Sequence, residues 1–277
     1  HSTLSVIRRR IPLEVFTKTF TLLHPVLEEM GLLRGKHVGM DTSAMHANAS
    51  MRGLTNRMTK EKYRAYVTRL AKKENVDTKD PAAINRFDRK RKGRKTSNKE
   101  WINPHDPDAK IGPSKHGNIR MIYKPEHTVD MESCALIDAQ ILLGDVADNT
   151  DMAERLCAAE KRACDGLGKD ALPIDTVTSD GGYFSAEEMV RLTTGIKPNI
   201  PDRTPIRNMS KLPEATRKII EGVRRRIKSR KGKALLKKRG MYIERSFAHI
   251  LDDGGLRRTT LRGRDNIQKR YSIAALG

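Results

Sequence analysis

Residues 174–189, Ile-Asp-Thr-Val-Thr-Ser-Asp-Gly-Gly-Tyr-Phe-Ser-Ala-Glu-Glu-Met, carry the pattern that decides the fold class. A β-rich run ends at Asp180, and the pair Gly181–Gly182 permits a tight turn. Ser185 with Glu188 has the spacing of a capping box, which predicts that a helix follows. A strand, an acid, a glycine turn and a helix in this order predict an α/β unit. Because such folds place their sites at the carboxyl ends of strands, Asp180 is a candidate site residue.

A second acid follows a second strand-like stretch, Lys36–Ser43. Val38 and Met40 alternate with other residues as in a buried strand, and the stretch turns polar at Asp41. An acid at the end of a buried strand is well placed to face a cleft. An aspartate that merely caps a turn remains the alternative on this pattern alone.

A third acid, Glu244, lies within Arg239–Leu251 (RGMYIERSFAHIL). Read as a helix, this stretch places four apolar residues on the face of the glutamate: Met241, Phe247, Ala248 and Leu251. A carboxylate on an apolar face is costly unless it is paired, protonated or bound to a cation. Glu244 therefore lies either at the edge of the stripe or at a cationic site.

The composition indicates a soluble, strongly basic chain. It has 277 residues, of which 37% are hydrophobic, enough for a real core. Its net charge of +21 favours a polyanionic partner, and nucleic acid is the usual one. No run approaches the roughly 18 apolar residues needed to span a bilayer, and no secretory signal is present, so we expect no membrane role. The three cysteines form no CxxC pair, which fits neither a disulfide framework nor a zinc module.

Two segments concentrate the positive charge. Residues 86–99 contain eight lysines and arginines against one acid, which predicts an exposed, mobile loop that either is simply solvated or tracks phosphates. Residues 217–239 contain twelve against one acid and lack aromatic residues, which predicts contact with a nucleic-acid backbone. The candidate DNA-binding residues are Arg89, Lys90, Arg91, Lys92, Arg224, Arg225, Arg226, Lys231, Arg245, Arg257 and Arg258.

The remaining elements follow from periodicity. Helical spacing predicts helices over residues 1–31, 59–75, 151–165 and 214–239, and alternation predicts a β-hairpin over residues 120–143. Thr150 is the predicted cap of the third helix. Three carboxylates brought together by such a fold would repel one another and favour a divalent cation, for which Mg²⁺ suits oxygen ligands. We expect His46, His127 and His249 to pack or hydrogen-bond rather than to bind metal.

Five blocks of sequence carry a resemblance to a known family. They are residues 35–51 (GKHVGMDTSAMHANASM), 86–110 (RFDRKRKGRKTSNKEWINPHDPDAK), 124–130 (KPEHTVD), 177–185 (VTSDGGYFS) and 242–263 (YIERSFAHILDDGGLRRTTLRG). In this order they resemble the DDE transposases of bacterial insertion sequences. The resemblance implies an α/β fold with an RNase H-like mixed sheet flanked by helices. It also implies a catalytic and metal-binding triad of Asp41, Asp180 and Glu244.

The resemblance further implies an organisation and an activity. Residues 1–31 would be the all-α remnant of a helical DNA-binding module, and residues 32–277 the catalytic domain, with basic insertions near 86–99 and 204–239. The activity would be cleavage of DNA strands at element ends and transfer into target DNA, with Mg²⁺, or Mn²⁺ instead, as cofactor. We expect a homodimer on double-stranded DNA, in the bacterial cytoplasm and associated with the nucleoid.

Other interpretations stay open. The chain starts at His1 and ends within an apolar pattern, so we expect a fragment cut at both ends, and a catalytically inactive DNA-binding remnant is the main alternative. A structure-specific nuclease of the same fold would differ in lacking strand joining. The related branch with a Tyr-x2-Arg-x3-Glu-x6-Lys signature is not matched, since positions 237, 240 and 251 are Lys, Gly and Leu. That branch's auxiliary basic residues are therefore not assigned here.

Overall fold

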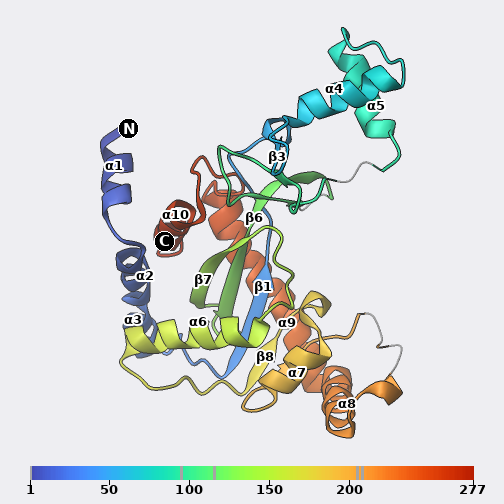
Figure 1. Ribbon diagram of the computed structural model, residues 1–277. Helices are drawn as coiled ribbons and strands as arrows, with labels where there is room; N and C mark the ends of the chain where they lie inside the picture. Colours follow the sequence, from blue (N-terminus) through green and yellow to red (C-terminus); the bar gives the residue numbers. More distant parts are fainter. Residues whose placement is uncertain (1, 94–95, 115–116, 204–205, 207–208) are drawn as a thin grey trace.

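A mixed β-sheet lies at the centre of the computed structural model, which describes residues 2–93, 96–114, 117–203, 206 and 209–277. Figure 1 shows this sheet between two groups of helices, with a small lobe extending from one end. Its main strands are β7 (Leu136–Leu143), β6 (Ile119–Asp130), β1 (His37–Thr42), β8 (Thr176–Thr178) and β9 (Lys197–Asn199), in this spatial order. The short strands β2 (Met45–His46) and β5 (Lys110–Pro113) pair with the first half of β6.

The strand directions combine antiparallel and parallel pairs. β6 is antiparallel to both β1 and β7, whereas β1, β8 and β9 are parallel to one another. The structure therefore confirms the expected α/β class and is consistent with an RNase H-like fold. The predicted hairpin over 120–143 is present as β6 and β7.

Helices cover both faces of the sheet. On one face Val38 and Met40 pack with α6 (Met152–Leu167), α7 (Ala186–Leu192) and α8 (Glu214–Lys228). On the other face lie α9 (Arg230–Phe247), the π-helical segment η4 (Ala248–Asp253) and α10 (Arg264–Ala274). Gly39 allows α9 to approach β1, because a Cβ there would lie 3.0 Å from Cδ1 of Ile243. Asp41, two residues later, faces the same side.

The N-terminal segment is helical, as predicted. It forms α1 (Ser2–Arg10), α2 (Leu13–Thr21) and α3 (Leu23–Glu29), which run along one side of the molecule (Figure 1). α2 packs against α6 and α10, and a Cβ on Gly166 of α6 would lie 2.6 Å from the carbonyl oxygen of Thr21. These helices are therefore docked closely on the main body.

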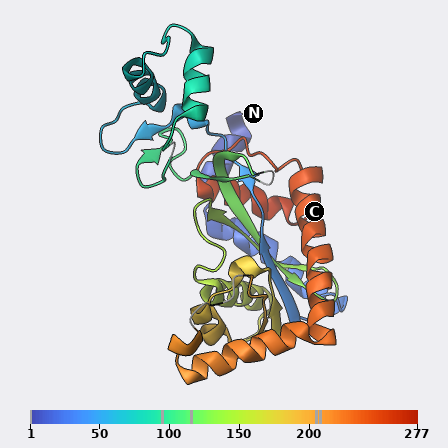
Figure 2. The same cartoon turned by 90° about the vertical axis from the view of Figure 1, so that its right-hand side faces the viewer.

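Residues 51–102 form a small lobe between β2 and β5 (Figure 2). It consists of η1 (Met51–Gly53), β3 (Thr55–Asn56), α4 (Tyr63–Lys73), α5 (Pro81–Lys90) and β4 (Trp101–Ile102). The prediction that residues 86–99 are wholly loop is wrong, because α5 extends through Lys90. Its start is fixed by Asp80, whose carboxylate accepts hydrogen bonds from the backbone N–H groups of Ala82 and Ala83 at 2.7 and 3.0 Å. Residues 94–95 of that basic block lie outside the described residues.

Other boundaries also differ from the predictions. The expected single helix over 214–239 is two helices, because Ser229 adopts an extended conformation and its hydroxyl caps α9 at the N–H of Gly232. α6 has Asp151 rather than Thr150 at its N-cap position. Two short 3₁₀ segments complete the described elements, η2 (Gly181–Tyr183) and η3 (Met209–Lys211), while residues 204–205 and 207–208 of the second basic insertion are not described. Among the described helices, none combines the length and the apolarity that crossing a bilayer requires.

Candidate active site

Asp41 and Asp180 lie at the ends of neighbouring strands. β1 and β8 pair in parallel up to Gly39 and Thr178, and each acid follows its pairing residue by two positions. The carboxylate of Asp180 accepts a hydrogen bond from the N–H of Gly182 at 2.7 Å, which caps η2. The sheet thus brings together two of the three acids that the sequence predicts, at one edge.

The surroundings of Asp41 oppose its negative charge. Burial, the strongest cause, raises its pKa to about 6, and the nearby charges of Asp180 and Asp148 act in the same direction. Arg239 and the N–H of Thr42 lower the pKa, through contacts of 2.7 and 2.8 Å with the carboxylate. At neutral pH the carboxylate is ionised, and a second positive charge beside it would relieve the repulsion.

A third acid at this edge, Asp148, was missed by the sequence reasoning. Its carboxylate accepts a hydrogen bond from the hydroxyl of Thr42 at 2.8 Å, next to Asp41. A Cβ on Gly182 would lie 2.9 Å from Oδ1 of Asp180 and 3.1 Å from Oδ2 of Asp148, so these two acids flank the same glycine. We refer to Asp41, Asp148 and Asp180 as the acid edge.

Topology explains why Asp148 reaches this place. β7 is antiparallel to β6, which is itself antiparallel to β1, so β7 and β1 point the same way. The carboxyl end of β7 therefore lies at the same edge as Asp41, and the turn that follows β7 contains Asp148. The predicted hairpin held part of this signal, because it makes β7 antiparallel to β6, but the antiparallel pairing of β6 with β1 was not predicted.

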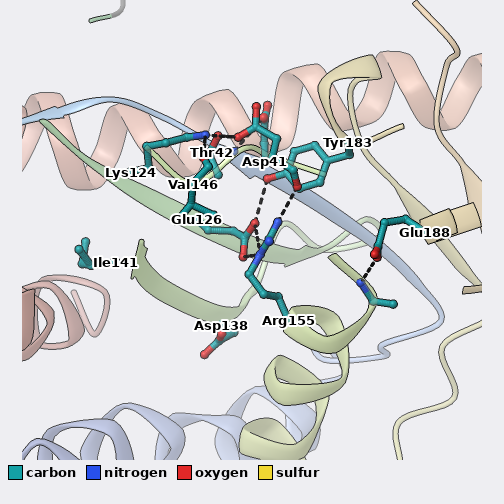
Figure 3. Close-up of polar contacts among 12 residues, drawn as sticks. Asp41, Thr42, Lys124, Glu126, Asp138, Ile141, Val146, Arg155, Tyr183 and Glu188 are labelled. Atoms are coloured by element: carbon teal, nitrogen blue, oxygen red, sulfur yellow. Dashed lines mark hydrogen bonds and ion pairs between the residues drawn. The ribbon is translucent and has the colours of Figure 1, made fainter. Parts of the chain in front are cut away.

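Each member of the acid edge already has a basic partner. Arg239 donates to Asp41 at 2.7 Å, and Arg203 donates to Asp180 at 2.6 Å. Lys124 pairs with Asp148 and also donates to the carbonyl of Val146 at 2.8 Å. Figure 3 shows Lys124 and Thr42 beside Asp41. Three basic side chains thus neutralise the three carboxylates of the acid edge.

A buried layer supports the acid edge from behind. The hydroxyl of Tyr183 donates to Glu126 at 3.0 Å, and Arg155 pairs with the same carboxylate at 2.9 Å (Figure 3). Arg155 also donates to the carbonyl of Asp148 at 2.6 Å, which ties the turn after β7 to β6. Burial raises the pKa of both Glu126 and Tyr183. This network fixes the turn that carries Asp148.

Glu244 lies elsewhere in the structure. Its side chain is exposed on α9, whereas Ile243 and Phe247 are buried and Met241 is 53% exposed. Of the two predicted placements, Glu244 therefore takes the edge of the apolar stripe, with the buried residues of α9 beside it, and the predicted inward position of Met241 is wrong. No three His, Cys, Asp or Glu side chains of the described residues gather closely enough to hold a metal ion, which applies to the acid edge as well as to Glu244. The residue of α9 that contacts Asp41 is Arg239.

The candidate DNA-binding residues divide into exposed and engaged side chains. The exposed ones are Arg89, Lys90, Lys92, Arg225, Lys231, Arg245 and Arg258. The engaged ones are Arg91 with Asp88, Arg224 with Asp202, Arg226 with the carbonyl of Pro198, and Arg257 with Asp252. The second group therefore has a structural role in this conformation, and the first group presents the positive surface.

The histidine predictions are confirmed for His127. It is fully buried, stacks on Phe247 at 4.1 Å, and its two ring nitrogens lie 2.8 and 2.6 Å from the hydroxyls of Ser246 and Tyr271. Burial lowers its pKa to about 3, so the imidazole is neutral at physiological pH. His46 forms a backbone hydrogen bond to Arg257, and His249 is exposed on η4.

The donor chemistry of the acid edge is of the kind that a hard divalent cation prefers. All three side chains offer carboxylate oxygens, which suit Mg²⁺ and Mn²⁺, and none offers nitrogen or sulfur. In this conformation the three carboxylates are not close enough together to hold a metal ion, so a cation would have to draw them together.

Comparison with known proteins yields one match. A family model described as "Transposase DDE domain" matches residues 88–276, which is more than half of the chain and includes Asp180 and Glu244 but not Asp41. Neither a curated protein nor a solved structure matches the chain.

Proposed function

The chain belongs to the transposase DDE domain family, and on this premise we propose that it cleaves DNA strands at element ends and joins the freed 3′ ends to target DNA. Membership of the family implies a transposase role and DNA binding. The observation that supports the chemistry best is the placement of Asp41 and Asp180 on adjacent parallel strand ends. Carboxylates so placed suit phosphoryl transfer assisted by divalent metal.

The roles of Asp41 and Asp180 are inferred from this placement, and that of Glu244 from the family resemblance. The three residues would hold Mg²⁺, or Mn²⁺ instead. The cation would activate the attacking oxygen and stabilise the leaving one. Arg239, Arg203 and Lys124 pair with the acid edge in the free protein, and each has the charge to bind a DNA phosphate instead.

Glu244 can take its role only if α9 turns. The glutamate is exposed in the free protein, four residues before the π-helical segment η4. Such irregular helical segments tolerate local changes of register and are common at functional sites. We infer that the end of α9 turns when DNA is bound, so that Glu244 would face the acid edge.

Replacing Glu244 by Gln tests this assignment. We expect metal-dependent cleavage of element-end DNA to fall by a factor of about 100 or more, because a charge that stabilises the transition state is lost. The matched control is Glu221→Gln, an exposed glutamate on α8, which should cleave like the unmodified protein. Full activity of Glu244→Gln would remove this residue from the site, and the absence of any metal-dependent cleavage by the unmodified protein would refute the proposed activity.

An inactive DNA-binding remnant is the second candidate function. It is favoured by the exposure of Glu244 and by the basic partner that each acid already has. This candidate predicts DNA binding that depends steeply on salt, needs no metal and is unchanged by Asp41→Asn. A structure-specific nuclease would cleave but fail to join, so a strand-joining assay distinguishes it from a transposase.

Asp148 is expected to contribute to cation binding at the acid edge. Replacing it by Asn should weaken the binding of Mn²⁺ to the free protein by about 10- to 100-fold, the usual cost of removing a side chain that supports a metal site. Titration followed by electron paramagnetic resonance measures this affinity independently of cleavage. Asp145→Asn, three residues earlier and exposed, is the matched control. Equal affinities in the two variants would contradict the role of Asp148.

A further inference from the structure

The outward face of α4 in the small lobe has an unusual composition. A shallow depression of about 550 Å³ lies on it, lined by Lys62, Arg64, Ala65, Thr68, Arg69 and Lys72. The two small residues lie between basic side chains. A long, flexible anion can therefore approach the helix closely while it meets positive charge on both sides.

Most of the positive charge on this face of α4 is not neutralised by acidic side chains of the lobe. Arg69 is held by Glu61 at 3.0 Å, and within the lobe Arg86 and Arg91 pair with Asp80 and Asp88. By contrast, Lys62, Arg64 and Lys72 are exposed and have no acidic partner among the described residues. Between residues 52 and 92 there are fourteen lysines and arginines against five acids. The lobe thus carries far more positive charge than its own acids neutralise.

The opposite face of α4 holds the helix in place. Trp101 packs edge-on against Tyr63 and Tyr66, with ring centroids 5.1 and 5.4 Å apart. Val67 and Ala71 are buried in the same direction. A helix fixed by its apolar face presents its basic face in one orientation, which reduces the entropy lost when a ligand binds.

We propose that this face of α4 binds the backbone of double-stranded DNA, as a contact surface separate from the acid edge. The inference rests on the proposed function, because it takes DNA as the substrate. α4 has 11 residues and is about 16 Å long, which corresponds to roughly five base pairs of duplex. The chain runs from β1, which carries Asp41, through β2 into the lobe (Figure 1), so the lobe is joined directly to the strand of the acid edge. Cations around alanine and threonine hold phosphates without reading bases, so the contact is independent of sequence.

The test compares two triple variants in the full chain. One replaces Lys62, Arg64 and Lys72 by Ala, and the control replaces Lys161, Lys169 and Lys197 by Ala. The control lysines are on the main body, and each is already paired with an acid. Fluorescence anisotropy with a random-sequence 30-base-pair duplex in EDTA gives Kd at several salt concentrations.

The expected result is specific to the lobe. The lobe triple variant should weaken Kd at least about tenfold, and its salt slope should fall by about 1 for each residue removed. The control triple should change Kd less than about threefold. Equal losses in the two variants, or tighter binding of duplex RNA than of duplex DNA by the unmodified protein, would overturn the inference. Circular dichroism confirms that each variant is folded.

A second variant tests whether the DNA backbone lies in direct contact with α4 or is only attracted to it electrostatically. Ala65→Leu adds bulk at the centre of the depression without changing charge, and it should weaken duplex binding about threefold or more if the backbone lies against the helix. Unchanged binding in this variant would also overturn the inference. Failure of the proposed cleavage would be seen separately, as the absence of metal-dependent cleavage by the unmodified protein, because the binding measurements need neither metal nor catalysis.

Discussion

Replacing Asp41 by Asn should abolish strand cleavage and, in the same protein, raise stability. Cleavage should fall at least about 1,000-fold, because a carboxylate at the centre of the acid edge is lost. The free energy of unfolding at pH 7.5 should rise by about 3 kcal/mol in metal-free buffer, since the pKa of Asp41 is raised from 3.8 to about 6 and each unit corresponds to about 1.4 kcal/mol. The attraction of Arg239 already contributes to that pKa.

The size of this stability difference depends on pH. Between pH 4 and 6 the folded protein keeps a proton on Asp41 that the unfolded chain has lost, so the stability of the unmodified protein falls as pH rises through this range. Asparagine cannot ionise, so the stability of the Asp41→Asn variant does not fall in this way as the pH rises. Urea unfolding in EDTA should show similar free energies of unfolding for the two proteins near pH 4, and a difference of about 3 kcal/mol in favour of Asp41→Asn above pH 6.5. The free energy of unfolding of Asp145→Asn should equal that of the unmodified protein at both pH values. An Asp41→Asn protein that is less stable than the unmodified protein at pH 7.5 would contradict this prediction.

Opposite effects on activity and stability are the signature of a functional site. A structural aspartate that pairs with Arg239 only to hold β1 against α9 would lose stability on replacement, because the arginine would be left without its partner. By contrast, Asp41 beside Asp148 and Asp180 lowers the free energy of unfolding of the free protein, and it raises that free energy only when a cation binds. Added Mn²⁺ should therefore raise the melting temperature of the unmodified protein more than that of the variant.

The sequence was sufficient for Asp41 and Asp180 because local patterns locate strand ends. Both acids directly follow short alternating runs, and parallel strands place such ends side by side. Asp148 needed one further step, since its position depends on β7 being parallel to β1 through an intervening antiparallel strand. The predicted hairpin supplied only the pairing of β6 with β7, and the pairing of β6 with β1 is a tertiary contact that local patterns do not show.

The errors have equally local causes. The apolar face predicted around Glu244 fails at Met241, which is exposed, and the regular period ends after Phe247, where residues 248–253 form a π-helical segment in which Ile250 and Leu251 are both buried. The loop predicted over residues 86–99 was inferred from charge alone, whereas the Asp80 cap and buried Ile84 make its first part helical. Counts of charge also cannot reveal that Arg91 and Arg224 are held by acids.

Replacing Trp101 by Ala should unfold the small lobe and leave the main sheet intact. The side chain is 4% exposed and packs against both tyrosines of α4, and its strand pairs with β3. Loss of a buried tryptophan costs about 3–5 kcal/mol, more than so small a unit can spare. Hydrogen exchange should show fast amides in α4 and α5, while β6 and β7 keep their protection.

The same variant links the stability of the lobe to DNA binding. If the face of α4 binds duplex DNA, unfolding the lobe should weaken Kd about as much as removing Lys62, Arg64 and Lys72, although every positive charge is still present. Trp101→Phe keeps an aromatic ring against Tyr63 and should retain most of the stability of the lobe and most of the affinity for duplex DNA. Tight duplex binding by a Trp101→Ala protein whose α4 exchanges freely would show that charge alone is enough. The fixed orientation of the helix would then be irrelevant to binding.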